Sequence, residues 1–135
     1  MEEGRTCNRQ KTMCVSDSGI IELEGMRFWA HHGCLEKERK DGNLFIVDFK
    51  GELDIAKASM TDSLEDTVNY GIVYDIVKEE MAIPSNLLEH VAGRIVRSIA
   101  EKLPEFESFS IRVSKRMPPV DGPVAWSRVT LNYKR

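Results

Sequence analysis

The sequence has few cysteines, no long run of apolar residues and no excess of positive charge. Its 135 residues include 19 Lys and Arg against 22 Asp and Glu, a formal net charge of −3. A chain without a basic surplus has no net attraction to nucleic-acid phosphates or anionic lipids, so we expect neither as a partner. No window approaches the roughly 18 apolar residues of a membrane span, and the N-terminus lacks the apolar core of a signal peptide. We therefore expect a cytoplasmic protein.

The three cysteines, Cys7, Cys14 and Cys34, are an odd number, and two of them lie in a polar segment. This is not the pattern of a disulfide framework, so reduced thiols are expected. His31, His32 and Cys34 could in principle ligate zinc. However, neighbouring side chains of an extended chain point to opposite faces, and the paired-cysteine spacing of zinc sites is missing, so no metal is predicted.

The chain is organised as one domain behind a short tail. Residues 1–18 have almost no apolar periodicity and end in a polar run, which predicts a flexible N-terminal tail. Residues 19–135 are enough for a single domain, since 41% hydrophobic and 30% charged residues are typical of a globular protein with a real core. No internal repeat or low-complexity segment interrupts it.

Four segments alternate apolar and polar residues with the period of two that is typical of half-buried strands. Gly25, inside the first of them, is expected to form a bulge or a close backbone contact. The four segments are residues 20–30, 45–53, 109–114 and 128–133.

Two amphipathic helices are predicted between the second and third strands. The first ends before Pro84, and the second begins at Asn86 and ends before Pro104. The apolar stripe of the first helix is Tyr70, Val73, Ile76, Val77 and Met81, and that of the second is Leu87, Leu88, Val91, Ala92, Ile95, Val96, Ile99 and Leu103.

The order ββααββ predicts an α+β fold, a four-stranded antiparallel sheet with both helices on one face. A sheet covered on one side only is expected to expose a row of apolar residues on the other side and two unpaired edges. We therefore expect the protein to oligomerise through its sheet edges.

Lys115 falls on the buried parity of the third strand. It continues the alternation of Phe109, Ile111 and Val113, at a position where an apolar residue is expected. One interpretation is a lysine whose methylene stem is buried while its ammonium reaches water. The other is a partly desolvated ammonium of lowered pKa, which exchanges protons as a general acid or base or forms a Schiff base. The pattern alone leaves both open.

Three further polar residues have both a structural and a functional interpretation. Glu89 follows Asn86 at the spacing of an Asn-x-x-Glu capping box, but a carboxylate at a helix N-terminus also suits the paired N–H groups of a planar ligand. Glu38 lies in a charged stretch, where a solvated carboxylate is expected from the pattern alone. Tyr70 is either part of the core or an interface, or a platform for a planar heterocycle.

Taken together, four runs of the sequence resemble the ordered motifs of dihydroneopterin aldolases. The resemblance extends from Ile20 to the C-terminus, so the tail lies outside it. The runs are GMRFWAHHGCLEKE (Gly25–Glu38), DTVNYG (Asp66–Gly71), LLEH (Leu87–His90) and SKRMPP (Ser114–Pro119).

The resemblance implies a reaction and an assembly. The family cleaves dihydroneopterin by a retro-aldol reaction to a hydroxymethyl-dihydropterin and glycolaldehyde, a step of folate biosynthesis. It uses no cofactor, no metal and no Schiff base, and some members also epimerise the substrate side chain. Its tunnelling fold joins sheets edge to edge in a homo-oligomeric ring of four, often stacked in pairs as an octamer, with the active sites between subunits.

The resemblance also implies catalytic roles at one end of the substrate. Lys115 corresponds to the proton donor and acceptor, which acts directly or through a water molecule. Glu38 corresponds to the residue that reaches the side-chain end of the substrate, with the backbone of Cys34 and Leu35 nearby.

The remaining matched positions would hold the pterin ring. Glu89 corresponds to the carboxylate that binds the amino and ring nitrogens, helped by the backbone of Leu88. Tyr70 would stack on the pterin and join the proton transfers through its hydroxyl, with the backbone of Val68 beside it. We hypothesise that Tyr70 and Lys115 act on one pterin from different chains.

Three alternatives stay open at the level of sequence. One is an epimerase of the same fold that acts on dihydroneopterin triphosphate, and another is a non-catalytic ring protein that binds a pterin or purine. The third is a zinc-dependent relative, for which only His31, His32 and His90 are available as histidine ligands.

Overall fold

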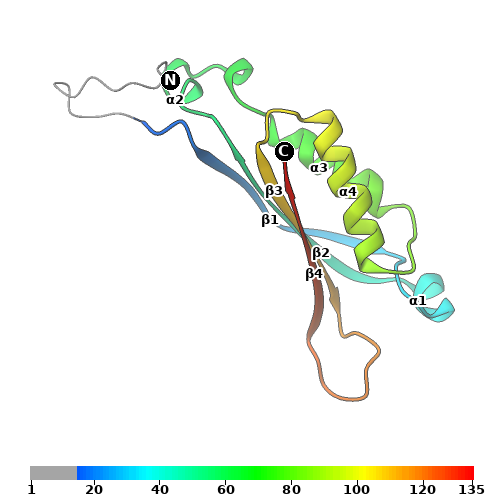
Figure 1. The fold of residues 1–135 in the computed structure, drawn as a ribbon. Helices are drawn as coiled ribbons and strands as arrows, with labels where there is room; N and C mark the ends of the chain where they lie inside the picture. Colours follow the sequence, from blue (N-terminus) through cyan, green and yellow to red (C-terminus); the bar gives the residue numbers. More distant parts are fainter. Residues whose placement is uncertain (1–14) are drawn as a thin grey trace.

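An antiparallel sheet with two long helices across one face forms the architecture of the chain (Figure 1). The computed structural model describes residues 15–135, so most of the predicted tail, with Cys7 and Cys14, lies outside the described residues. In chain order the elements are β1 (Gly19–Ala30), α1 (Glu36–Asp41), β2 (Asn43–Leu53), α2 (Ala58–Thr61), η3 (Leu64–Asp66), α3 (Tyr70–Met81), α4 (Leu88–Lys102), β3 (Ser108–Arg116) and β4 (Trp126–Lys134).

Three short helical segments make the predicted order ββααββ incomplete. The segment α1 separates β1 from β2, and α2 and η3 separate β2 from α3. They have six, four and three residues. Segments of this length contain too little periodicity to be recognised from an apolar pattern, and α1 lies within a run of charged residues.

The four strands pair in the order β1-β2-β3-β4, and every pair is antiparallel. The register of β1 against β2 shifts between Leu23 and Met26, so the predicted bulge is confirmed. Gly25 adopts φ 77° there, a conformation that favours glycine, and its N–H donates to Asp48 Oδ1 at 2.7 Å. Across β2 and β3, Phe45 lies opposite Lys115.

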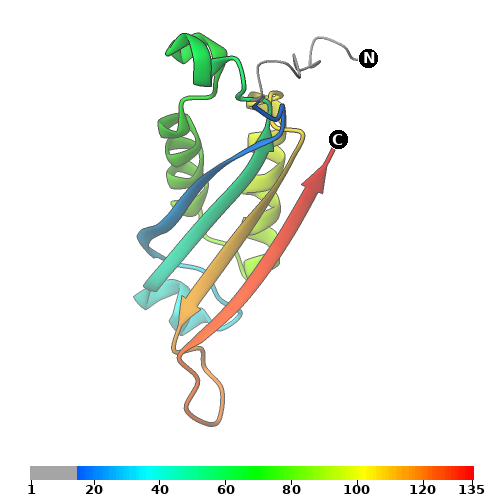
Figure 2. The same ribbon diagram turned by 90° about the vertical axis from the view of Figure 1, so that its left-hand side faces the viewer.

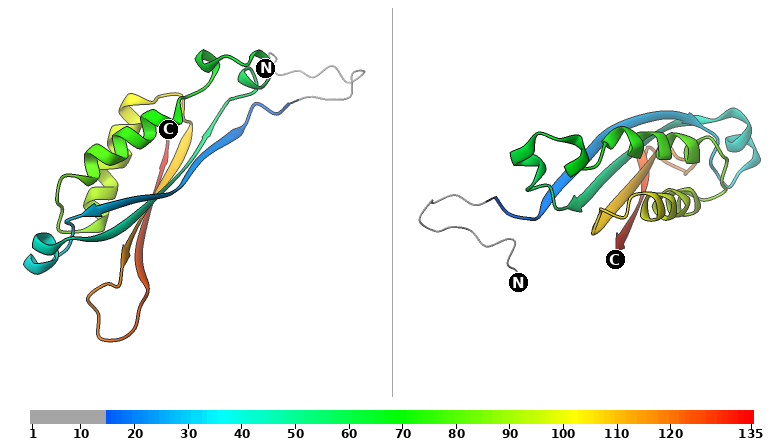
Figure 3. Two further views of the ribbon diagram at one scale, coloured as in Figure 1. Left: turned by 180° about the vertical axis from the view of Figure 1, so that it is seen from behind. Right: turned by 90° about the horizontal axis from the view of Figure 1, so that it is seen from above.

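Both long helices cover the same face of the sheet, as the alternation predicted. The strands lie side by side in Figure 2 with α3 and α4 behind them, and the view from above in Figure 3 shows both helices on one side. The helix α3 packs over β1, and α4 packs over β3 and β4. The fully buried apolar side chains of this layer are Phe45, Val47, Phe49, Val73, Val77, Met81, Val91, Ile95, Ile99, Phe106, Ile111 and Val113.

The burial of Tyr70 and the start of the second long helix differ from the prediction. Tyr70, expected within the apolar stripe, is the first residue of α3 and is 60% exposed, because it lies beyond the part of the helix that packs on the sheet. The helix α4 begins at Leu88 rather than Asn86, with Leu87 as its N-cap. Leu87 is exposed because it precedes the buried turns.

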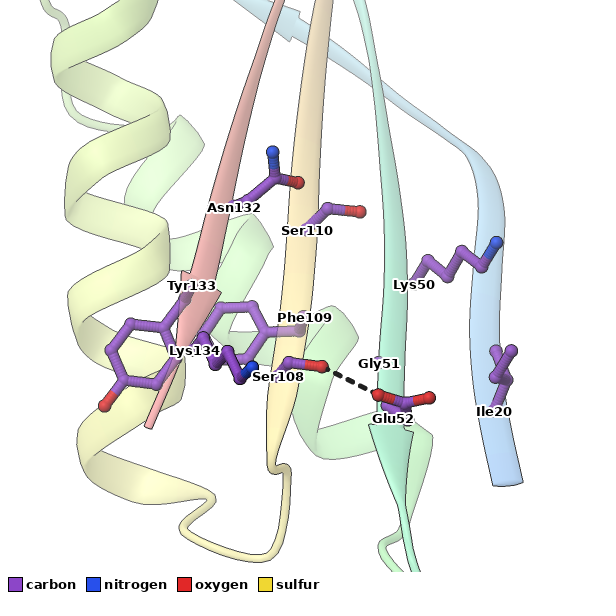
Figure 4. A pocket seen from close by; sticks show the side chains of 10 residues that line it. All are labelled: Ile20, Lys50, Gly51, Glu52, Ser108, Phe109, Ser110, Asn132, Tyr133 and Lys134. Atoms are coloured by element: carbon purple, nitrogen blue, oxygen red, sulfur yellow. Dashed lines mark hydrogen bonds between the residues drawn. The ribbon is translucent and has the colours of Figure 1, made fainter. Parts of the chain in front are cut away.

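The uncovered face of the sheet is mostly polar, so the expected exposed row of apolar residues is confined to part of it. A hollow of about 450 Å³ lies on the four strands. Figure 4 draws its lining residues, among which Ser108 donates to Glu52. This hydrogen bond is 3.1 Å long. Further along the same face Arg112 pairs with Asp48 at 3.1 Å. The solvent-side positions of the alternating strands are themselves polar, and therefore this face is stable in water without a cover. Ile20 and Trp29 of the β1 edge are exposed apolar side chains on this face, and Leu44, Ile46 and Trp126 are partly exposed there.

In the sheet of residues 15–135, β1 and β4 are the two edges, as predicted. Over the same residues, no helix has both the length and the apolar composition to cross a bilayer.

Gly51 provides a test of the packing between the sheet and the core. A Cβ atom at this position would lie 2.6 Å from ring carbons of Phe106 and Phe49, which are buried and meet edge to face. We expect Gly51→Ala to lower the free energy of unfolding by about 1–3 kcal/mol, because the rings must move. Denaturant unfolding measures this, and Lys50→Ala on the polar face is the control, expected within about 0.5 kcal/mol of wild type. Equal stabilities of the two variants would contradict this packing.

Candidate active site

A buried ion pair joins the end of β3 to α1. Lys115 Nζ lies 2.8 Å from Glu38 Oε2, and the two side chains are only 11% and 16% exposed. The residues are 77 positions apart in the sequence. Two charges this far from water are stable only as a hydrogen-bonded pair, since each alone would bear a desolvation cost of several kcal/mol. The interpretations of Lys115 as a lysine that reaches water and of Glu38 as a solvated carboxylate are therefore both wrong.

The loop between β1 and α1 folds closely around Glu38. Glu38 Oε1 accepts from the Leu35 N–H at 3.3 Å, and a Cβ atom on Gly33 would lie only 2.5 Å from the same oxygen. Any residue larger than glycine at position 33 would therefore collide with the Glu38 side chain. Arg39 Nη1 donates to the carbonyls of Gly33 and Cys34, at 2.7 and 2.9 Å. These bonds hold the carboxylate of Glu38 against Lys115.

The N-terminus of α4 presents a second carboxylate. Glu89 is the second residue of the helix, and within residues 15–135 no hydrogen bond or ion pair engages its exposed carboxylate. The capping box expected with Asn86 is wrong, because the helix starts two residues later and Leu87 has no side-chain oxygen to cap it. The N–H groups of Leu88 and Glu89 are in the first turn, where helix geometry provides no carbonyl partner. This end of α4 lies at the same end of the molecule as α1 (Figure 1).

Hydrogen bonds between two loops connect these carboxylates. The Gly33 N–H donates to the Ser85 carbonyl, and the Ser85 N–H donates to His32 Nδ1, both at 3.0 Å. Ser85 lies between α3 and α4, so the loop that leads into α1 and Glu38 is bonded to the loop that leads into Glu89. Cys34, an exposed free thiol, lies in the same contact, with Sγ 3.6 Å from the Asn86 carbonyl.

His32 is buried in its neutral form. Its ring is 1% exposed and meets Phe45 edge to face, with the ring centres 5.1 Å apart. Burial, and next the positive charge of Arg94, lower the pKa of His32 to about 4. Because Nδ1 accepts from Ser85, the proton of the neutral ring lies on Nε2.

Tyr70 and Val68 lie away from Lys115, Glu38 and Glu89, beside the first turn of α3. They line an apolar hollow of about 460 Å³ beside α2 and η3, together with Ile55 and Leu64. The 12 residues of α3 span about 18 Å and separate this hollow from the loop that meets α1. The structure therefore brings Lys115 and Glu38 together and places Leu88 and Glu89 at the same end of the molecule. Within one chain, Tyr70 and Val68 lie at the other end of α3.

The other candidate residues, Leu35 and His31, make hydrogen bonds with nearby residues or are exposed to solvent. The Leu35 carbonyl accepts from the N–H groups of Glu38 and Arg39 in the first turn of α1, and its side chain is exposed. His31 Nδ1 contacts the Arg39 carbonyl at 2.9 Å. Across the described part of the chain, no three His, Cys, Asp or Glu side chains gather in a group that could hold a metal ion.

The sequence reasoning missed Ser85 and Arg94. The sequence suggests His32 as a possible zinc ligand and not as a buried structural residue, although His32 precedes a glycine in a predicted loop. Ser85 follows a proline in a turn, and Arg94 lies on the polar side of a helix, so neither pattern distinguishes them from ordinary surface residues.

The chain is similar to proteins of known family. A family profile described as dihydroneopterin aldolase matches residues 21–132. A dihydroneopterin aldolase of Staphylococcus epidermidis is 40% identical over 104 residues, which cover 76% of this chain and 86% of that protein. One of Streptococcus pyogenes is 37% identical over 103 residues, covering 76% and 87%.

Solved structures share the fold. The Escherichia coli dihydroneopterin aldolase in complex with neopterin superposes with a TM-score of 0.78 at 18% identity, covering 85% of this chain and 98% of that one. The Burkholderia thailendensis enzyme bound to guanine gives a TM-score of 0.72 at 13% identity, covering 88% and 93%.

The burial of neutral His32 predicts stability that is lost in acid. The pKa is about 4 in the folded chain against 6.5 for an ordinary histidine, so both states are neutral well above pH 6.5 and His32 adds no pH dependence there. As the pH falls from 6.5 towards 4, the unfolded chain binds a proton that the folded chain does not, and the free energy of unfolding falls. At pH 5 we expect a loss of about 2 kcal/mol from this group.

The measurement is denaturant unfolding at pH 7.5 and pH 5. His32→Asn is the comparison, since an amide oxygen can accept from the Ser85 N–H but does not titrate in this range. We expect wild type to lose more stability than His32→Asn between the two pH values. Equal losses would show that His32 is not the group responsible.

Proposed function

The chain belongs to the dihydroneopterin aldolase family, and we propose that its Lys115–Glu38 pair performs the proton transfers of that reaction. The enzyme cleaves dihydroneopterin to a hydroxymethyl-dihydropterin and glycolaldehyde in folate biosynthesis. The observation that carries the proposed mechanism is the 2.8 Å contact between the Lys115 ammonium and the Glu38 carboxylate, nearly excluded from water. A proton donor and a proton acceptor in contact are what an acid–base cleavage requires.

The substrate supplies the electron sink of this reaction. When the ring imine of dihydropterin is protonated, it accepts the electron pair of the breaking carbon–carbon bond and becomes an enamine. The bond breaks as the neighbouring side-chain hydroxyl loses its proton and glycolaldehyde leaves, and the enamine then takes up a proton on carbon. In our proposal, Glu38 is directed at the side-chain end of the substrate, and Lys115 gives and takes these protons, directly or through a water molecule.

The free carboxylate of Glu89 suits the other end of a pterin. An amino group and an adjacent ring N–H form two parallel donors, which a carboxylate accepts in a charge-assisted pair. Neopterin and guanine, the molecules bound in the two solved relatives, present this same donor edge. We propose that Glu89, with the backbone of Leu88 beside it, binds the pterin ring and directs the side chain of the substrate towards Lys115 and Glu38.

We further propose that Tyr70 and Val68 reach this site from a neighbouring chain. Tyr70 is 60% exposed and lies at the far end of α3 from Glu89, so it is free to stack on a heterocycle bound by another subunit. The unpaired edges β1 and β4 are suited to join sheets into a ring of four, or two stacked rings. The cytoplasmic location expected from the sequence stays a prediction.

Lys115→Met tests the catalytic pair, because methionine occupies the space of the buried lysine stem but has no ammonium group to give or take a proton. We expect kcat to fall by about 10²- to 10⁴-fold while affinity for the pterin stays within a few-fold of wild type. The measurement is anaerobic turnover of dihydroneopterin, following glycolaldehyde and the hydroxymethyl-dihydropterin. Lys102→Ala, at the exposed far end of α4, is the control and is expected to retain wild-type turnover.

Wild-type kcat in Lys115→Met would contradict the role of Lys115. Epimerised substrate without glycolaldehyde from the wild-type enzyme would instead favour epimerase activity, and dihydroneopterin triphosphate would be the next substrate to test.

Mixing two inactive variants tests whether one site uses two chains. Lys115→Ala and Tyr70→Ala are each expected to lose most activity. When the two are refolded together, a site that takes Lys115 from one chain and Tyr70 from another regains both residues in about a quarter of cases. If both residues came from one chain, no site could be restored, and the mixture would stay as inactive as its components.

A further inference from the structure

Ser85 is a buried residue in the α3–α4 loop, and each of its polar groups is engaged. Its backbone donates to His32 Nδ1 and accepts from the Gly33 N–H, both at 3.0 Å. Its hydroxyl accepts from Arg94 Nη2 at 2.9 Å and contacts His90 Nδ1 at 2.7 Å. Because a guanidinium can only donate, the Ser85 oxygen is the acceptor of the bond with Arg94. With 5% exposure, water cannot replace these partners.

Arg94 holds the loop from the other side. Its Nη1 donates to the carbonyl and the carboxylate of Glu80, at 2.8 and 2.7 Å, and its Nη2 donates to the Ile83 carbonyl at 2.7 Å. The guanidinium therefore bonds to the end of α3, to the loop and to the Ser85 hydroxyl. A planar fork with several fixed donors can make all of these bonds, whereas an ammonium cannot.

The two loops joined at Ser85 lead directly to the two carboxylates of the proposed site. Gly33, bonded to the Ser85 carbonyl, is packed against Glu38, and Glu89 follows Ser85 by four residues at the start of α4. On the same side, His32 contacts the ring of Phe45, which lies opposite Lys115 in the sheet. A displacement of Ser85 would therefore move the pterin-binding carboxylate relative to the proton-transfer pair.

We propose that Ser85, held by Arg94, is a positioning residue that sets the distance between Glu89 and the Lys115–Glu38 pair. This inference rests on the function proposed above. A pterin bound at Glu89 places its reacting carbon against Lys115 only when the two loops keep this spacing. Displacements of about 1 Å can reduce a reaction rate by about 100-fold without loss of binding. The role of Ser85 is thus in kcat, and not in affinity for the ring.

The experiment compares Ser85→Ala and Arg94→Lys with Arg97→Lys, a matched control on the exposed side of α4. For each enzyme we would measure kcat with dihydroneopterin and Kd for neopterin well below the melting temperature of that variant. We expect kcat to fall about 10- to 100-fold in the first two variants, with Kd within about threefold of wild type. The control should match wild type in both. Arg94→Lys provides the test if Ser85→Ala does not fold.

Two results would overturn the positioning role. One is a lowered melting temperature in both variants with unchanged kcat and Kd, which would make the cluster a structural element only. The other is a rise in Kd that accounts for the whole loss of activity. If the wild-type enzyme releases neither product, the proposed catalytic function fails. This outcome differs from a failure of the positioning role, because it appears without any substitution.

Discussion

A nearly buried ammonium and a partly buried carboxylate are tolerated in a fold only while they remain in contact, and this constraint applies at one end of the molecule. Lys115 on β3 and Glu38 on α1 are almost excluded from water, so separating them would leave two desolvated charges. The surrounding loop is built to prevent this. Gly33 leaves room for the carboxylate, and Arg39 ties the loop carbonyls together.

The two carboxylates at this end are in opposite states, and their proposed roles differ accordingly. Glu38 is paired and nearly buried, which suits a group that exchanges protons with a fixed partner. Glu89 is exposed and unpaired within residues 15–135, at the positive end of α4, which suits a group that awaits a cationic or N–H-rich ligand. Ser85 bonds to His32 and Gly33 in the loop before α1 and precedes Glu89 by four residues, so one loop contact lies between the two carboxylates.

Within one chain, two of the predicted pterin-binding residues lie apart from the others. The apolar hollow with Val68 and exposed Tyr70 lies at the opposite end of α3 from Glu89. The proposed assembly would act in two ways, because it would pair the edge strands and bring the separated residues together. The polar uncovered face of the sheet does not oppose such an arrangement, since it needs no apolar cover.

The sequence by itself determined the strands, the two long helices, the bulge at Gly25 and the buried position of Lys115. These features follow from local periods of two and 3.6 and from the conformational freedom of glycine, all of which act between near neighbours. The four family motifs supplied candidate site residues, but not their arrangement. Only the tertiary structure decided that Glu38 is buried against Lys115, 77 residues away, and that Ser85 bonds to His32, 53 residues away. Such contacts depend on how the sheet and helices pack, which no local pattern contains.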